Sequence, residues 1–206
     1  MLDEVRAAFP AFTDRFEGRL GYMYTDKLGL VTTGRGNLID TGPRRMTSGD
    51  PIGNADPAPA LALPWCHFDW SFALAAEVRQ AWSIVKNAWP QVQSVACERL
   101  TNLRLSADAI DALTFTKLDE MWSQLRSRFA NLESSPAPAQ LGILSMAWAM
   151  GPAFNYPRFR TAALAGDWGT CGAECFMQGP GIAGRNAMNE KLFLAARDGV
   201  ALAEVL

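Results

Sequence analysis

The first regular pattern along the chain is helical, with phenylalanines recurring at intervals of three and four residues. This spacing would place Phe9, Phe12 and Phe16 on one face of a helix. Pro10 fits best in the first turn of a short helix, because a proline inside a helix removes a hydrogen bond and clashes with the preceding turn. The pattern therefore predicts a short helix that begins near Pro10 and ends at Glu17.

The pattern changes after Gly18, a residue type that commonly ends helices. Residues 20–24 are expected to form a strand, residues 25–29 a turn and residues 30–33 the returning strand. A helix end and a β-hairpin are therefore expected to face each other, although they lie close together in the sequence.

The rest of the chain is predicted to begin with a long loop and to continue mostly as helices. Residues 41–64 contain five prolines and several glycines, which argues against a helix or a central strand there. Helices are expected over 71–88 with Pro90 as the stop, over 91–103, from an N-cap at Ser106 through 112, and over 116–129, 141–150, 156–165, 169–177 and 186–205. Residues 141–150 are apolar almost all round and predict a buried central helix.

Together these elements predict an α+β protein, with a small N-terminal β-hairpin lobe, a larger mostly helical lobe and a cleft between them. A chain of 206 residues is long enough to bury a full core, and we expect a single domain over 1–206.

Composition narrows the classes of partner. A net charge of −2 argues against a general nucleic-acid binder, which would carry a basic face. No stretch is long and apolar enough to predict a membrane span. The first twelve residues contain early acids and no long apolar core, so they do not resemble a secretory signal. We expect a monomer made in the cytoplasm, with no nucleic-acid partner and no membrane insertion.

The four cysteines and the single histidine argue against metal or cofactor chemistry. Cys66, Cys97, Cys171 and Cys175 form neither a dense disulfide framework nor a Cys-x-x-Cys motif. Cys171 and Cys175 lie one helical turn apart and could share a metal, but buried thiols are the favoured interpretation. His67 is the only histidine, which excludes sites with several histidine ligands and disfavours a histidine-activated nucleophile. No metal and no cofactor is expected.

Candidate chemistry is concentrated in residues 16–37. Glu17, Asp26 and Thr32 lie at the end of the predicted helix, in the turn and on the returning strand, and Gly34 and Gly36 follow. Two such carboxylates taken alone are most often solvated surface groups. One carboxylic acid that protonates a leaving oxygen and one carboxylate that activates water are, however, the groups needed to hydrolyse a glycosidic bond.

Residues 16–36 also resemble the Glu–Asp–Thr catalytic motif of the T-even phage lysozyme family, without a gap. A weaker similarity appears in MAWAMGPAFNYPRF (146–159) and in QGPGIAGRNAM (178–188), so that the resemblance covers about half of the chain. It implies a lysozyme-like fold and an endolysin-type N-acetylmuramidase. Such an enzyme cleaves the β-1,4 bond between N-acetylmuramic acid and N-acetylglucosamine in peptidoglycan, its expected partner.

Carried over by position, the resemblance makes Glu17 the general acid, and makes Asp26 and Thr32 the residues that hold and activate the water, with inversion of configuration. The substrate-binding residues that it implies are Tyr24, Gly36, Asn37, Phe154 and Arg185.

The chain departs from the family at two places. Asn37 stands where the family usually has a histidine, so an ion pair that the family makes there is expected to be missing. Residues 41–103 form a loop-plus-helix segment that is longer than its counterpart. Trp65 and Trp70, beside the loop, are the best candidates for stacking on sugar, although packing in the core is the commoner role of tryptophan.

Two alternative functions accompany the muramidase hypothesis, and its biological setting is a separate question. A lytic transglycosylase would need the glutamate but not Asp26 and Thr32, and a non-catalytic wall-binding module would be expected to lack Glu17. The biological setting stays open between an endolysin, a tail-associated lysin and a secreted antibacterial effector. Each would act on the cell wall after release or delivery from the cytoplasm.

Overall fold

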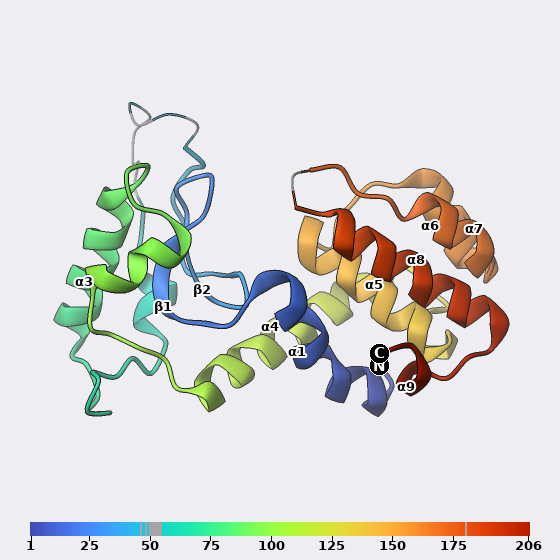
Figure 1. Cartoon of the computed structure of the whole chain (residues 1–206), viewed down its shortest axis with the longest axis horizontal. Coiled ribbons are helices and arrows are strands. Elements are labelled where there is room, and N and C mark those ends of the chain that lie inside the picture. The colour runs from blue at the N-terminus through green and yellow to red at the C-terminus, as the bar shows by residue number, and fades with distance from the viewer. Residues whose placement is uncertain (46, 48, 50–54, 180) are drawn as a thin grey trace. The chain divides into compact units, whose positions relative to one another are not determined.

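The computed structural model of the chain describes residues 1–45, 47, 49, 55–179 and 181–206. It is an α+β protein, mostly helical, with one small antiparallel sheet (Figure 1). The strands are β1 (Leu20–Thr25), β2 (Val31–Gly34) and β3 (Asn37–Leu38). The helices are α1 (Asp3–Glu17), α2 (Ala58–Leu61), α3 (Ala75–Ala88), α4 (Ala107–Arg128), α5 (Ala137–Met150), α6 (Pro157–Ala165), α7 (Trp168–Glu174), α8 (Ala183–Asp198) and α9 (Leu202–Val205), with 3₁₀ helices η1 (Ser94–Leu100) and η2 (Leu132–Ser134).

The chain divides into two compact units. The helical unit consists of Met1–Phe16 and Thr116–Leu206, and the hairpin unit consists of Glu17–Phe115. The prediction of a single domain over 1–206 stays a prediction. The hairpin unit is close to half of the chain, so it is larger than the small hairpin lobe that we expected.

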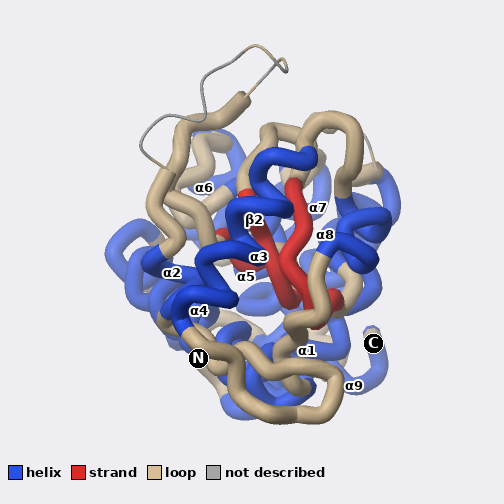
Figure 2. Tube along the Cα trace, turned by 90° about the vertical axis from the view of Figure 1, so that its left-hand side faces the viewer, coloured by secondary structure: helices blue, strands red, loops and turns tan. Residues whose placement is uncertain are grey.

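The hairpin unit is built on the predicted β-hairpin. Its sheet has the order β1–β2–β3 with antiparallel neighbours, so one short strand is added to the two expected. Helix α3 packs against β1 and β2 and lies over the sheet in Figure 2. Its buried face contributes Val78, Trp82 and Val85 to the core of the unit, beside Met23 and Val31 of the sheet.

The helical unit is organised around α5, which is buried over almost its whole length and confirms the predicted central helix. Helix α8 packs closely on α5. Gly142 of α5 permits this approach, since a Cβ there would lie only 2.7 Å from the ring of Phe193. The ring of Phe9, near the start of the chain, lies 5.0 Å from that of Trp148 in an edge-on contact. The core of this unit therefore joins the segment 1–16 to residues more than a hundred positions later in the sequence.

The first helix is longer than predicted, because Pro10 lies inside α1 rather than in its first turn. A proline there removes one backbone hydrogen bond and costs about 3 kcal/mol. Val5, Phe9 and Phe12 are all buried on this helix, and each such side chain contributes about 1.5–3 kcal/mol. Burial of one continuous face therefore outweighs the proline. The predicted end at Glu17 is confirmed, with Gly18 following at φ +71°.

Other helix boundaries were also wrong. The helix predicted over 186–205 is two helices, α8 and α9, separated at Gly199. The helix predicted over 71–88 begins at Ala75, and the one predicted over 91–103 is the 3₁₀ helix η1, Ser94–Leu100. The two helices predicted on either side of residues 113–115 are one helix, α4. Within α4, the hydroxyl of Thr114 donates to the carbonyl of Ile110 (2.7 Å), so this β-branched residue is accommodated inside the helix.

The proline-rich stretch 41–64 contains a short helix, α2, which the proline count had argued against. Its prolines lie at the N-terminal end, where a missing N–H costs little. Part of this predicted loop, residues 46, 48 and 50–54, falls outside the described residues.

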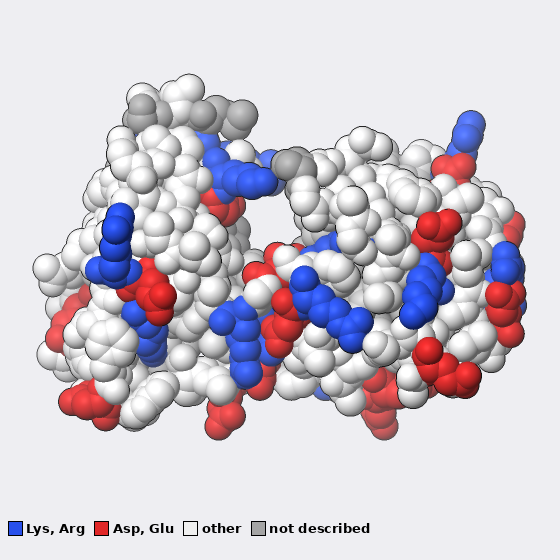
Figure 3. All heavy atoms as spheres, in the orientation of Figure 1, with Lys and Arg blue, Asp and Glu red and all other residues white. Residues whose placement is uncertain are grey.

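The sequence contains nearly equal numbers of basic and acidic residues, 19 and 21. On the face shown in Figure 3, basic and acidic side chains are interspersed. None of the helices in the described part of the chain combines the length and apolarity that crossing a bilayer requires.

The buried-thiol interpretation of the cysteines is confirmed, because all four are free and buried. Burial is the main reason why the pKa values of Cys171 and Cys175 are raised to about 12.

Candidate functional site

The candidate catalytic residues Glu17, Asp26 and Thr32 all belong to the hairpin unit. Glu17 is the last residue of α1, and the positive φ of Gly18 turns the chain from the helix into β1. Asp26 follows the last residue of β1, and Thr32 lies on β2. The helix–strand–turn–strand order predicted from the sequence is therefore present with each residue in its expected element.

Asp26 is fixed by the turn that it opens. One carboxylate oxygen, Oδ1, accepts the backbone N–H groups of Leu28 (2.8 Å) and Leu30 (2.9 Å). The backbone closes the same turn, because the N–H of Gly29 donates to the carbonyl of Asp26 (3.2 Å). These bonds orient the carboxylate and leave Oδ2 without a hydrogen-bond donor among the residues that the structure describes. Oδ2 can therefore accept a hydrogen bond from a ligand.

Thr32 is linked to this turn through Leu30. The Thr32 hydroxyl lies 3.4 Å from the carbonyl oxygen of Leu30 and 3.3 Å from that of Tyr24, and it can donate to one of them. The same Leu30 carbonyl accepts the backbone N–H of Asp26 (3.0 Å). A hydroxyl that donates its proton to the backbone offers only lone pairs to a ligand. Thr32 and Asp26 therefore both present hydrogen-bond acceptors, supported by one peptide segment.

Tyr24 lies among these groups. It is paired with Thr32 across β1 and β2 and is only 9% exposed. Its pKa is raised to about 12, chiefly by burial, next by the negative charge of Glu17, and also by that of Asp26. Interactions with the hydroxyl of Thr32 and the backbone of Gly36 act in the opposite direction. The Tyr24 phenol is thus a neutral group close to all three candidate catalytic residues.

The raised pKa of Tyr24 predicts that the folded state loses stability at alkaline pH. A phenol with a folded-state pKa of about 12 and an unfolded value of 10.0 stabilises the fold fully below pH 10, and this contribution is lost as the pH rises through 12. It amounts to about 1.4 kcal/mol lost by pH 11. We therefore expect Tyr24→Phe to be less sensitive than the wild type when free energies of unfolding are compared at pH 9 and pH 11.

Tyr156→Phe, which removes a phenol from the helical unit, is the control for the substitution itself. An equal loss of stability in the wild type and in Tyr24→Phe would show that the Tyr24 phenol does not titrate in this way.

Gly36 is required by its position under Glu17. It has φ +72°, and a Cβ built there would lie 3.1 Å from Oε2 of Glu17 and 3.7 Å from its Cδ. Any other residue would be strained in the backbone and would press on the carboxylate. Gly36 therefore helps to define the position of Glu17.

Asn37 takes part in the same turn but is almost completely buried, with 2% exposure. Its Oδ1 accepts the backbone N–H of Arg35 (3.1 Å), which confirms that asparagine can hydrogen-bond here. Its Nδ2 is buried without a hydrogen-bond partner among the described residues.

Arg35 is a residue that our sequence interpretation missed. Its side chain is 2% exposed, and Nη1 donates to Asp111 Oδ1 (2.7 Å) and to Thr114 Oγ1 (3.1 Å), both on α4. This ion pair anchors the turn that contains Gly36. Asn37 is uncharged and cannot form an ion pair. The ion pair of this turn is made two residues earlier, by Arg35 with Asp111. The only sequence signal was a charged residue between two glycines.

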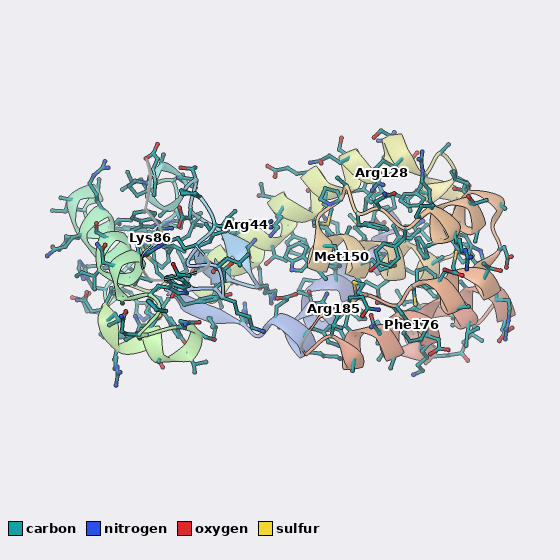
Figure 4. All side chains as sticks on the ribbon, turned by 90° about the horizontal axis from the view of Figure 1, so that it is seen from above. Arg44, Lys86, Arg128, Met150, Phe176 and Arg185 are labelled. Carbon is teal, nitrogen blue, oxygen red and sulfur yellow. The ribbon has the colours of Figure 1, made fainter. Side chains whose placement is uncertain are left out.

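The remaining two predicted substrate-binding residues belong to the helical unit. Phe154 is 6% exposed and packs among aromatic rings, with the Phe129 centroid 6.1 Å away. Arg185 extends from α8 (Figure 4), is 2% exposed, places its guanidinium 4.7 Å from the ring centroid of Phe16, and donates to the carbonyl of Ser145 (3.2 Å). Their role in substrate binding stays a prediction.

The two candidate sugar-stacking tryptophans, Trp65 and Trp70, differ in solvent exposure. Trp65 is 1% exposed, and its indole N–H donates to the carbonyl of Ala60 (2.8 Å). It is a core residue, which is the commoner role of tryptophan, and this rules it out as a stacking candidate. Trp70 is 61% exposed, in a segment where Phe68, Phe72 and Leu74 are also exposed.

Comparison with known proteins adds no assignment. No protein-family model matches the chain, and no curated protein sequence matches it significantly.

Proposed function

We propose that this protein is a peptidoglycan hydrolase, an N-acetylmuramidase of the phage endolysin type. The observation that carries the proposal is the arrangement of the hairpin: Thr32 pairs with Tyr24 across the strands, Asp26 directly follows β1, and the carboxylate of Glu17 lies against Gly36 in the turn that follows β2. Two carboxylates and a hydroxyl gathered in this way match the requirements of glycosidic bond hydrolysis. The proposal includes a lysozyme-like fold, with a substrate cleft between two lobes, and peptidoglycan as the partner.

In the proposed mechanism, Glu17 is the general acid and gives its proton to the glycosidic oxygen as the bond to C1 breaks. A water molecule attacks C1 from the opposite face. Asp26 Oδ2 and the Thr32 oxygen, as two acceptors, hold the two hydrogens of that water and leave one of its lone pairs directed at C1. Asp26 then takes the proton that the attacking water loses.

Neighbouring groups support these roles. Two backbone N–H groups, those of Leu28 and Leu30, hold Asp26 Oδ1 and so fix the orientation of its carboxylate. The close packing of Gly36 restricts where the Glu17 carboxyl group can lie. The neutral Tyr24 phenol adds no charge of its own between the two carboxylates.

The mechanism predicts inversion of configuration. A water held on the face opposite the leaving group requires a carboxyl separation of roughly 6.5–9.5 Å, whereas a nucleophilic aspartate requires roughly 5–5.5 Å. We expect the first product from the β-linked glycan to be the α-anomer, with no covalent intermediate. Proton NMR of the early products from purified peptidoglycan, together with their masses, tests this.

Each alternative gives a different product. A β-anomer would make Asp26 a nucleophile. Anhydro-muramic ends, which are lighter by one water than hydrolysed ends, would identify a lytic transglycosylase. Binding to peptidoglycan without any cleavage would identify a wall-binding module.

A further inference from the structure

Lys86 is a buried charged residue with no role in the proposed chemistry. It extends from α3 (Figure 4), and its side chain is 1% exposed. Helix α3 lies in the segment 41–103, called the added segment below because the resemblance to the lysozyme family implies a shorter counterpart. Its ammonium group donates to Oδ2 of Asp40 (2.6 Å) and to the backbone carbonyl of Gly29 (2.7 Å). Gly29 belongs to the turn that Asp26 opens. A side chain of the added segment is thus bonded directly to the candidate catalytic turn.

Asp40 extends this connection to β2. Its Oδ2 also accepts the backbone N–H of Val31 (2.9 Å), the first residue of that strand, and its Oδ1 accepts the N–H of Gly42 (2.7 Å). Its side chain is completely buried. The Lys86–Asp40 ion pair therefore joins three places: the turn at Gly29, the start of β2 and the beginning of the added segment.

Two further contacts hold the same turn from the same side. The backbone N–H of Arg45 donates to the carbonyl of Leu28 (2.7 Å). Gly29 is covered so closely that a Cβ there would lie 3.1 Å from the Trp89 ring and 3.3 Å from the Arg45 side chain. The added segment thus contacts the outer side of the turn, while the N–H groups of Leu28 and Leu30 face Asp26 Oδ1.

A buried ion pair is an expensive way to fill a core. Removing two charges from water costs several kcal/mol per ion, and apolar residues of similar volume often give equal or greater stability. Unlike an apolar residue, Lys86 fixes the positions of the groups around it, because its N–H donors must point at the Asp40 carboxylate and the Gly29 carbonyl.

We propose that Lys86 is a positioning residue, which together with Asp40 fixes the turn 26–30 so that the Asp26 carboxylate is held in one orientation. The added segment 41–103 then serves as a support for the catalytic turn. The catalytic part of this inference rests on the proposed muramidase function, but the fixing of the turn does not.

The test compares Lys86→Met with Val78→Ala. Both residues are buried on α3, but Val78 has no bond to the turn, so Val78→Ala controls for a weakened core. NMR-detected hydrogen exchange would be measured for the backbone amides of Leu28 and Leu30. We expect Lys86→Met to speed their exchange about tenfold or more relative to the other core amides of the hairpin unit. Val78→Ala should leave this ratio unchanged.

Activity on purified peptidoglycan provides the second measurement. A loosened turn misplaces Asp26 without removing sugar contacts, so we expect Lys86→Met to lower kcat by about 10²-fold with little change in KM. Val78→Ala should keep the wild-type kcat per folded molecule. If Lys86→Met does not fold, Lys86→Gln replaces it, because a glutamine retains a neutral donor but loses the charge; a smaller shift in the same direction is then expected.

The two proposals fail in different ways. An active wild type combined with unchanged exchange at Leu28 and Leu30 in the Lys86 variant would overturn the positioning role and leave the muramidase intact. A wild type that does not cleave peptidoglycan would overturn the muramidase, and exchange alone would then decide whether Lys86 fixes the turn.

Discussion

Glu17→Gln is expected to lower the rate of peptidoglycan cleavage by about 10²–10⁴-fold, the usual contribution of a general acid. Glutamine has nearly the same shape as glutamate, so the side chain can keep its place over Gly36, but it has no proton to give to the glycosidic oxygen. The fold should be retained, since Glu17 is a half-buried residue at the end of a helix. Initial rates and free energies of unfolding, measured on the same preparation, check both statements.

Glu4→Gln is the matched control, because Glu4 is an exposed carboxylate in the first turn of the same helix. It should leave the rate unchanged. If Glu17→Gln cleaved peptidoglycan at nearly the wild-type rate, Glu17 could not be the acid.

Asp26→Asn is expected to cause a loss of similar size, about 10²–10⁴-fold, because an amide cannot take the proton from the attacking water. The oxygen of asparagine can still accept the N–H groups of Leu28 and Leu30, so the turn should survive. Asp26→Ala removes that acceptor as well and should destabilise the fold by about 1–3 kcal/mol. Comparing rate and stability for the two variants separates the chemical role of Asp26 from its structural one.

Asp69→Asn provides the control for this pair. Asp69 is exposed, and its Oδ1 accepts the N–H of the residue two positions on, Ser71 (3.0 Å), as Asp26 does with Leu28. Its substitution should change neither rate nor products. Wild-type activity in Asp26→Asn would mean that another group activates the water.

The parts of the site that could be predicted from sequence are those set by local patterns. The phenylalanine spacing and Gly18 located the helix end at Glu17, and two stretches of strand-type residues on either side of a turn located both hairpin strands. The approach of Gly36 to Glu17 was not derivable in the same way, because it depends on how a turn folds back on a helix end. A resemblance to a motif identified Gly36 without giving this physical reason.

Long-range partners account for what could not be predicted. Pro10 was misplaced because the burial that keeps α1 intact comes from residues far away in the sequence, such as Trp148 against Phe9. Arg35 and Lys86 looked like ordinary surface charges, since nothing near them in the sequence indicates the partners Asp111 and Asp40. A charged residue has no periodic signature when its burial depends on a single distant carboxylate.

The way in which the sequence enters the helical unit has a consequence for synthesis on the ribosome. Met1–Phe16 is made before Thr116–Leu206 but belongs to the same unit, and Phe9 is completely buried there beside Trp148. Phe9, on the apolar face of α1, therefore cannot be buried against Trp148 until the nascent chain extends past residue 148. The hairpin unit, Glu17–Phe115, is contiguous and can fold before that point. During translation the strands are thus made before the core that contains Met1–Phe16 can close, and burial of α1 depends on residues of the segment 116–206.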